Sequence, residues 1–161
     1  MRRSLPSILG LLASLCAIVQ SSAQETQEPR FEGKNVRIER DLTRPGNPVV
    51  RISFGCHSDA KDGDLEKLKA YPQLREVDIL SENITDEGLE HLKALAHLDT
   101  LKLNSSAVTN CGLRHVASLC GLRNLVLMRS QITPEGLRWL KKAPSLRELC
   151  LIRIPITSDG T

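Results

Sequence analysis

One sequence pattern recurs along this chain at a fixed interval, and it constrains the fold more than any other feature. The segment ITDEGLEHL begins at residue 84, VTNCGLRHV begins 24 residues later, and ITPEGLRWL begins 24 residues after that. The shared positions form two columns with the same spacing: Thr85, Thr109, Thr133 and Thr157, and Gly88, Gly112, Gly136 and Gly160. A fixed period of this length is typical of repeat proteins, in which each copy folds as one unit and buries its apolar face against neighbouring copies.

Each copy predicts a short helix followed by a strand. Apolar residues are three positions apart at Leu89, Leu92 and Leu95 and two apart at Leu101 and Leu103, which are the spacings of a helix face and of a strand face. The threonine suits the start of the helix, because its hydroxyl accepts a hydrogen bond from an unpaired N–H group of the first turn. We therefore expect an α/β fold with a parallel sheet on one face and short helices on the other.

The segment LDTLKLNSSAVTNCGLRHVASL resembles a leucine-rich repeat of the T-D-x-G-L type, which is common in exported bacterial proteins and similar to the cysteine-containing repeats of F-box-associated proteins. The match covers residues 50–160 and implies a leucine-rich-repeat solenoid. In this family an asparagine or cysteine ladder often runs along the inner turn. The corresponding positions here are Glu82, Ser106, Ser130 and Ile154, so we expect a buried ladder only at the two serines.

The N-terminal part of the chain predicts export. Residues 1–23 have the layout of a secretory signal peptide, with two arginines, an apolar run from Leu5 to Val19, and small residues before Gln24. A retained membrane anchor is the alternative, but this run is shorter than the roughly 20 apolar residues of a membrane-spanning helix. Residues 24–34 are polar and predict a flexible leader. We expect a secreted, periplasmic or cell-envelope protein that does not stay in the membrane after signal cleavage.

The remaining chain divides into a cap and the repeats. Residues 35–60 alternate in polarity around an Arg-Pro-Gly-Asn-Pro turn, which predicts a hairpin whose second arm is the first strand of the parallel sheet. Its first arm is expected to shield the end of the core, as terminal caps of solenoids do. Residues 61–161 hold the repeats. The first copy is degenerate, with Lys61 and Asp64 in place of the threonine and glycine, and the last is incomplete.

The outward side of the predicted sheet holds the candidate binding residues. Alternation along the strands sends every second residue away from the core, and the central outward column is expected to change from polar to apolar along Ser53, Asp78, Lys102, Val126 and Cys150. An apolar patch with flanking arginines is typical of a partner-binding surface. The candidate partner-binding residues are Lys102, Asn104, Val126, Met128, Arg129, Cys150, Ile152 and Arg153. The alternative is that further structure covers this end of the sheet.

The composition and motifs predict no catalytic, cofactor-binding or metal-binding residues. No nucleophile, base and orienting group converge on one predicted pocket. His91 and His115 share a helix column, which we interpret as two solvated residues, with a two-histidine metal site as the alternative. Trp139 occupies the same column and is expected to pack against a helix flank, with an exposed binding aromatic as the alternative.

The charge balance bears on the kind of partner, and the cysteine spacing bears on disulfides. The chain has 22 lysines and arginines against 19 aspartates and glutamates, a balance that gives no reason to expect a nucleic acid partner. Cys111 and Cys120 would lie roughly 13 Å apart along one helix, too far for a disulfide. We expect free thiols at most cysteines.

The sequence therefore predicts a non-enzymatic protein–protein interaction module, exported and binding an unidentified protein through the parallel-sheet face. The alternatives are a structural or self-assembling envelope spacer and a fragment of a longer repeat protein. Self-association is a further expectation, because the last predicted strand is flanked by Leu149, Leu151, Ile154 and Ile156 and lacks the lysines and inward charges that protect exposed strand edges.

Overall fold

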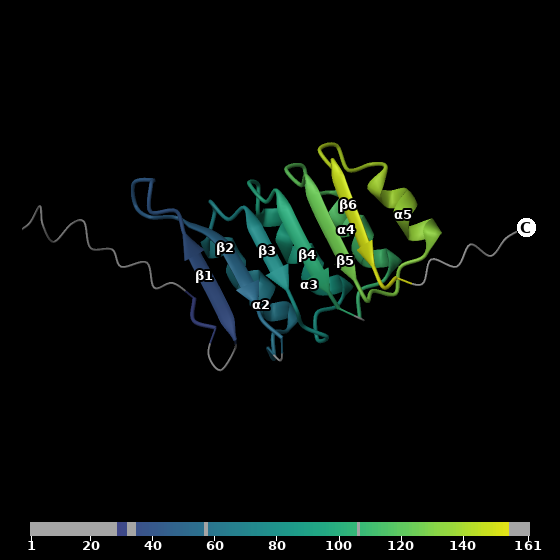
Figure 1. The fold of residues 1–161 in the computed structure, drawn as a ribbon, viewed down its shortest axis with the longest axis horizontal. Coiled ribbons are helices and arrows are strands. Elements are labelled where there is room, and N and C mark those ends of the chain that lie inside the picture. Colours follow the sequence, from purple (N-terminus) through teal and green to yellow (C-terminus); the bar gives the residue numbers. More distant parts are fainter. Residues whose placement is uncertain (1–28, 32–34, 57, 106, 155–161) are drawn as a thin grey trace, which may run out of the picture.

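The computed structural model of this chain describes residues 29–31, 35–56, 58–105 and 107–154 (Figure 1). These residues form one six-stranded sheet in which the spatial order follows the chain order. The first two strands are antiparallel, and every later strand is parallel to its predecessor. The strands are β1 (Val36–Arg40), β2 (Val49–Phe54), β3 (Glu76–Ile79), β4 (Thr100–Asn104), β5 (Asn124–Met128) and β6 (Glu148–Ile152).

Short helices connect the parallel strands and cover one face of the sheet (Figure 1). The helices are α2 (Asp62–Glu66), α3 (Asp86–His91), α4 (Asn110–Ala117) and α5 (Pro134–Leu140), and the first two continue into the 3-10 turns η1 (Lys67–Ala70) and η2 (Leu92–Ala94). The predicted α/β class with a parallel sheet on one face and helices on the other is confirmed. The antiparallel pairing of β1 with β2 forms a hairpin in the predicted place.

The constant spacing of the copies keeps equivalent residues side by side in the sheet. Ser53 pairs with Asp78, Asp78 with Lys102, Lys102 with Val126, and Val126 with Cys150. This is the predicted central column on the outward face. The next residue along each strand faces the helices, because successive side chains of a strand point to opposite faces of the sheet.

The core lies between the sheet and the helices. The inward residues of β3, β4 and β5 and the leucine column of α3 and α4 are buried: Val77, Ile79, Leu101, Leu103, Leu125, Leu127, Leu89 and Leu113. Each such side chain stabilises the fold by about 1.5–3 kcal/mol relative to an exposed position. Leu149 of β6 pairs in register with the buried Leu125 but is 41% exposed, because no described element packs beyond the last strand.

The N-terminal end of the core is covered by an aromatic pair. The Phe31 ring packs edge-on against Phe54, with ring centroids 5.4 Å apart, and the Tyr71 hydroxyl donates to the Pro29 carbonyl at 3.5 Å. Residues 29–31 of the predicted flexible leader therefore contact the domain, and the polar composition around them gave no sign of this. The predicted signal peptide at 1–23 and the rest of the leader lie outside the described residues.

No helix in the described part of the chain has the length and apolar character needed to span a bilayer.

A chain of polar contacts joins each helix start to the next. Asp62 accepts hydrogen bonds from the Thr85 N–H at 2.8 Å and the Thr85 hydroxyl at 2.6 Å. Asp86 accepts from the Thr109 N–H at 2.8 Å and the Thr109 hydroxyl at 2.5 Å. The next copy has Asn110, which accepts from the Thr133 N–H at 3.0 Å and donates its amide to the Thr133 hydroxyl at 2.9 Å. We call these three contacts the helix-start ladder.

The threonines also act within their own helices. The Thr85 hydroxyl accepts from the Glu87 N–H at 3.3 Å, and the Thr109 hydroxyl accepts from the Cys111 N–H at 3.2 Å, as the sequence predicts for capping residues. Thr133 differs, because its hydroxyl donates to the Glu135 carboxylate at 2.6 Å and makes no cap bond.

The glycine column exists because of this ladder. A Cβ atom on Gly88 would meet the Asp62 carboxylate closer than 3.0 Å, a distance that real Cβ atoms essentially never show. A Cβ atom on Gly112 would likewise come too close to the Asp86 carboxylate. A Cβ atom on Gly136 would come too close to the side-chain oxygen of Asn110. Each glycine thus leaves room for the ladder side chain of the preceding copy.

Buried serines follow three of the strands, partly at positions other than those predicted. The Ser81 hydroxyl donates to the Ala60 carbonyl at 2.9 Å and the Ser105 hydroxyl to the Ile84 carbonyl at 2.8 Å. Ser130 is buried as predicted and donates to the Met128 carbonyl at 3.3 Å. The buried position is therefore one residue earlier in the first two turns, and the predicted Ser106 lies outside the described residues. In the third turn the position equivalent to Ser81 and Ser105 holds Arg129, which is exposed and takes the left-handed conformation with a φ of 54°.

Candidate functional site

The structure brings six of the eight candidate residues together on the face of the sheet away from the helices. In one column Lys102, Val126 and Cys150 are adjacent, and in the next Asn104, Met128 and Ile152 are adjacent. The four members of these columns on β4 and β5 are half-buried, whereas Cys150 and Ile152 on β6 are exposed. We call Val126, Met128, Cys150 and Ile152 the apolar patch.

The two remaining candidates, Arg129 and Arg153, directly follow β5 and β6. Both have left-handed backbone conformations, with φ of 54° and 52°, which only a few per cent of non-glycine residues adopt. Both side chains are exposed, and the Arg129 N–H donates to the Ile152 carbonyl at 3.1 Å. The two arginines therefore occupy equivalent positions at the edge of the apolar patch.

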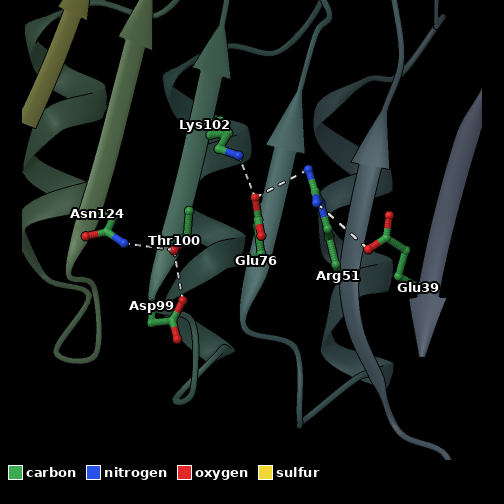
Figure 2. A network of polar contacts seen from close by, with 7 residues as sticks. All are labelled: Glu39, Arg51, Glu76, Asp99, Thr100, Lys102 and Asn124. Atoms are coloured by element: carbon green, nitrogen blue, oxygen red, sulfur yellow. Dashed lines mark hydrogen bonds and ion pairs between the residues drawn. The ribbon is translucent and has the colours of Figure 1, made fainter. Parts of the chain in front are cut away.

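The other half of this face carries alternating charges (Figure 2). Arg51 on β2 lies between two carboxylates, with its Nη1 3.8 Å from Glu39 and its Nη2 3.5 Å from Glu76. Lys102 on β4 approaches the same Glu76 oxygen at 2.7 Å. We call Glu39, Arg51, Glu76 and Lys102 the charged row. Such partly exposed pairs contribute about 0–1 kcal/mol each, so the row adds more to the pattern of charge on the surface than to stability.

A shorter polar contact continues along the same face. The Thr100 hydroxyl donates to Asp99 at 2.9 Å and accepts from the Asn124 amide at 3.4 Å (Figure 2). These bonds orient Asn124 on β5 next to the charged row. In the columns of Lys102 and Asn104 the face thus changes from charged or polar residues on β4 to apolar residues on β5 and β6, whereas the first column keeps Asn124 and Glu148.

Asp78 is the residue that the sequence placed in the central column but did not identify as a site residue. It is half-buried, and among the described residues it makes no hydrogen bond or ion pair, whereas Arg51 and Lys102 both pair with Glu76. Burial raises the pKa of Asp78 above its ordinary value of 3.8; Lys102 and Arg51 oppose this rise, and Glu76 adds to it. Because the Asp78 carboxylate has no hydrogen-bond partner in the described part of the chain, it is available to accept a hydrogen bond from a bound molecule.

A hollow of about 360 Å³ lies beside Asp78, at the end of the face formed by the hairpin. Arg37 and Glu39 of β1 and Arg51 and Ser53 of β2 line it together with Asp78. Both signs of charge are present, so the hollow suits a polar partner group that both donates and accepts hydrogen bonds.

Asp78 gives a prediction on the pH dependence of stability. The pKa of Asp78 is higher in the folded than in the unfolded chain. Its contribution to the free energy of unfolding is therefore fully present at a pH below 3.8 and is lost as the pH rises through the folded-state pKa. Asp78→Asn is expected to have a larger free energy of unfolding than the wild type at about pH 7, and this gain should disappear at a pH below 3.8. Urea unfolding at a series of pH values measures it, with the exposed Glu82→Gln as control. A gain that is the same at every pH would contradict the assignment.

The residues considered for chemistry do not form a catalytic or metal-binding cluster within the described ranges. Cys56, Cys111, Cys120 and Cys150 are unpaired and exposed. Across the described ranges no three His, Cys, Asp or Glu side chains gather as a metal site would require. Trp139 is half-buried and packs against Arg114 of the neighbouring α4, as the sequence predicts for a helix flank.

Comparisons with known proteins found no match to this chain, either among models of protein families or among curated proteins.

Proposed function

We propose that this chain is a leucine-rich-repeat solenoid protein that binds another protein through the open face of its sheet and catalyses no reaction. The repeat assignment is supported by strands that add in chain order and by the helix-start ladder, which makes the same contact between successive copies. In such an array each copy contacts only its neighbours, and the strands present one continuous surface.

One observation carries the binding proposal: the apolar patch lies in register on two adjacent strands of the open face, and its exposure rises toward β6. Apolar and sulfur-containing side chains adapt well to a partner, because Met and Cys are polarisable and Met is flexible. Protein interfaces combine an apolar centre with a polar rim in which arginine is frequent. Arg129, Arg153, Lys102 and Asn104 supply that rim here.

The place of action follows from the N-terminal segment. If residues 1–23 act as the signal peptide that their sequence predicts, the domain meets its partner outside the cytoplasm. A secreted, periplasmic or cell-envelope location is therefore part of the proposal.

The proposal predicts that charges placed in the apolar patch abolish partner recovery. Val126→Asp combined with Met128→Asp is expected to lower recovery from an extract of the producing cells by about tenfold or more, because a buried charge at an interface centre has no partner. Quantitative mass spectrometry of material captured on the tagged full chain measures this. Leu42→Asp is the matched control, because Leu42 is 77% exposed in the β1–β2 turn.

Thermal unfolding of both variants checks that the fold is retained. If the patch variant and Leu42→Asp recover every partner equally well, the open face is not the binding surface.

Self-association is a second candidate, favoured by a separate observation. Among the described strands β6 pairs on one side only, with β5, and both Leu149 and Ile152 are 41% exposed. An apolar strand edge of this kind is a template for a second chain. Recovery of an untagged copy of this chain by the tagged one would identify this mode in the same capture experiment.

A further inference from the structure

A second hollow, of about 530 Å³, lies on the helix side of the molecule, away from the proposed protein-binding face. Its walls come from three successive copies: Lys93 of η2, Cys111, Arg114 and His115 of α4, and Trp139 of α5 with Lys142 just after that helix. No aspartate or glutamate is among the lining residues. We call this hollow the tryptophan groove.

Two cations lie against the single tryptophan of the groove. The Arg114 guanidinium is 5.0 Å from the centroid of the Trp139 ring, and the Lys142 ammonium is 4.7 Å from it. Both distances fall within the roughly 6 Å range of an attractive cation–π contact. The ring therefore has two cations within cation–π range, and both of them line the groove.

The carboxylates of the described chain leave these two cations uncompensated. Neither Arg114 nor Lys142 forms an ion pair within the described ranges, whereas Lys93 pairs with Glu90 at 3.2 Å. The hydrogen bond from Lys93 lowers the pKa of Glu90, so that carboxylate is already committed. The charge of Glu90 neutralises that of Lys93, so the groove keeps the two positive charges of Arg114 and Lys142. The half-buried His115 lines the groove beside them.

We propose that the tryptophan groove binds a small oxyanion-bearing ligand, with a phosphate, sulfate or carboxylate group held by Arg114 and Lys142, the two unpaired cations of the described chain that line it. A planar guanidinium binds two oxygens of such a group at once, and a guanidinium already held against an aromatic ring loses less freedom on binding. The volume of the groove lies within the roughly 300–1,000 Å³ of small-molecule sites. This inference does not depend on the proposed protein-binding function.

The sole tryptophan of the chain gives a direct test, since Trp139 alone supplies the tryptophan fluorescence. The full chain is titrated with inorganic pyrophosphate, sulfate and citrate, with the ionic strength held constant by sodium chloride. A saturable change in fluorescence is expected with at least one of them. Arg114→Gln is expected to weaken binding of that anion about tenfold or more, because charge-assisted hydrogen bonds are lost.

Arg138→Gln is the matched control. Arg138 is the residue before Trp139 and is exposed, and its replacement removes the same charge without changing the lining of the groove. Arg138→Gln is expected to alter the Kd for the anion by less than about twofold, because salt screens an exposed charge that lies outside the groove. Circular dichroism of both variants checks that the helices are retained.

Alkylation of Cys111 is the second readout, because this exposed thiol lines the groove. A bound anion is expected to slow its reaction with iodoacetamide and to leave the exposed Cys56 and Cys120 unchanged. Vesicles of phosphatidylglycerol, compared with phosphatidylcholine, distinguish a lipid phosphate from a free one. A response to the anionic vesicles alone, lost in Arg114→Gln, supports the proposal with a lipid as the source. A signal that does not saturate with any probe, or equal weakening by Arg114→Gln and Arg138→Gln, would overturn it.

Discussion

Replacing Gly88 with alanine is expected to lower the free energy of unfolding by about 2–3 kcal/mol, because the new methyl group overpacks a filled site and disturbs hydrogen bonds. The new Cβ would meet the Asp62 carboxylate group. It would lie 2.9 Å from the Asp62 Cγ and 3.2 Å from the Asp62 Cα. That carboxylate cannot turn aside without releasing the Thr85 N–H and hydroxyl. Urea unfolding followed by circular dichroism measures the loss.

Gly63→Ala is the matched control for this experiment. Gly63 also lies in a helix, and a Cβ there would have no atom within 4 Å. Alanine is the better helix former by about 1 kcal/mol, so this variant should be unchanged or slightly more stable.

A double replacement separates overpacking from a general effect on the helix. In the Asp62→Ala background the carboxylate is gone, and of the three nearest atoms only the backbone Cα at 3.2 Å remains, so adding Gly88→Ala should cost clearly less than in the wild type. The same loss in both backgrounds would show that the Asp62 side chain does not explain the glycine.

The second large effect is expected at Asp86, whose side chain carries the middle contact of the helix-start ladder. Asp86→Ala should lower the free energy of unfolding by about 2 kcal/mol, because the Thr109 N–H and hydroxyl both lose their acceptor. Asp86→Asn should cost less than about 1 kcal/mol, since Asn110 makes the equivalent pair of bonds to Thr133 in the next copy. Urea unfolding ranks the two variants.

Glu87→Ala is the control, because the exposed Glu87 is a neighbouring acidic residue in the same first turn and makes no ladder bond through its side chain. It is expected to change stability by less than about 0.5 kcal/mol. If Asp86→Asn is as damaging as Asp86→Ala, hydrogen bonding through this side chain is not what joins the copies.

The ladder also shows why the copies are not equivalent. Its column runs through Asp62, Asp86 and Asn110 and then reaches Pro134, whose side chain has no hydrogen-bonding group. The contact is thus made by two carboxylates and one amide and stops at Thr133. The change from carboxylate to amide keeps the geometry but removes the charge.

Much of the open face of the sheet could be predicted because it depends on local periodicity alone. Once Leu101 and Leu103 are assigned inward, Lys102 and Asn104 are outward, and the equal length of the copies sets Val126 and Cys150 beside Lys102. The importance of Asp78 could not be predicted in this way. Its raised pKa depends on burial, which outweighs the opposing charges of Lys102 and Arg51 on the neighbouring strands, and this balance cannot be seen in its own strand.

The sequence by itself determined the α/β class, the order of helices and strands, the hairpin and the register of the sheet. The helices, strands and hairpin follow from caps and from apolar spacings of three and two within one copy, and the register follows from the constant interval between copies. Only the tertiary structure decided the contacts between copies: the helix-start ladder, the buried Ser105, the cations on Trp139 and the exposure of Leu149. The physical reason is that these depend on which side chains of two stacked copies come within hydrogen-bonding or packing distance, and on whether another layer covers them.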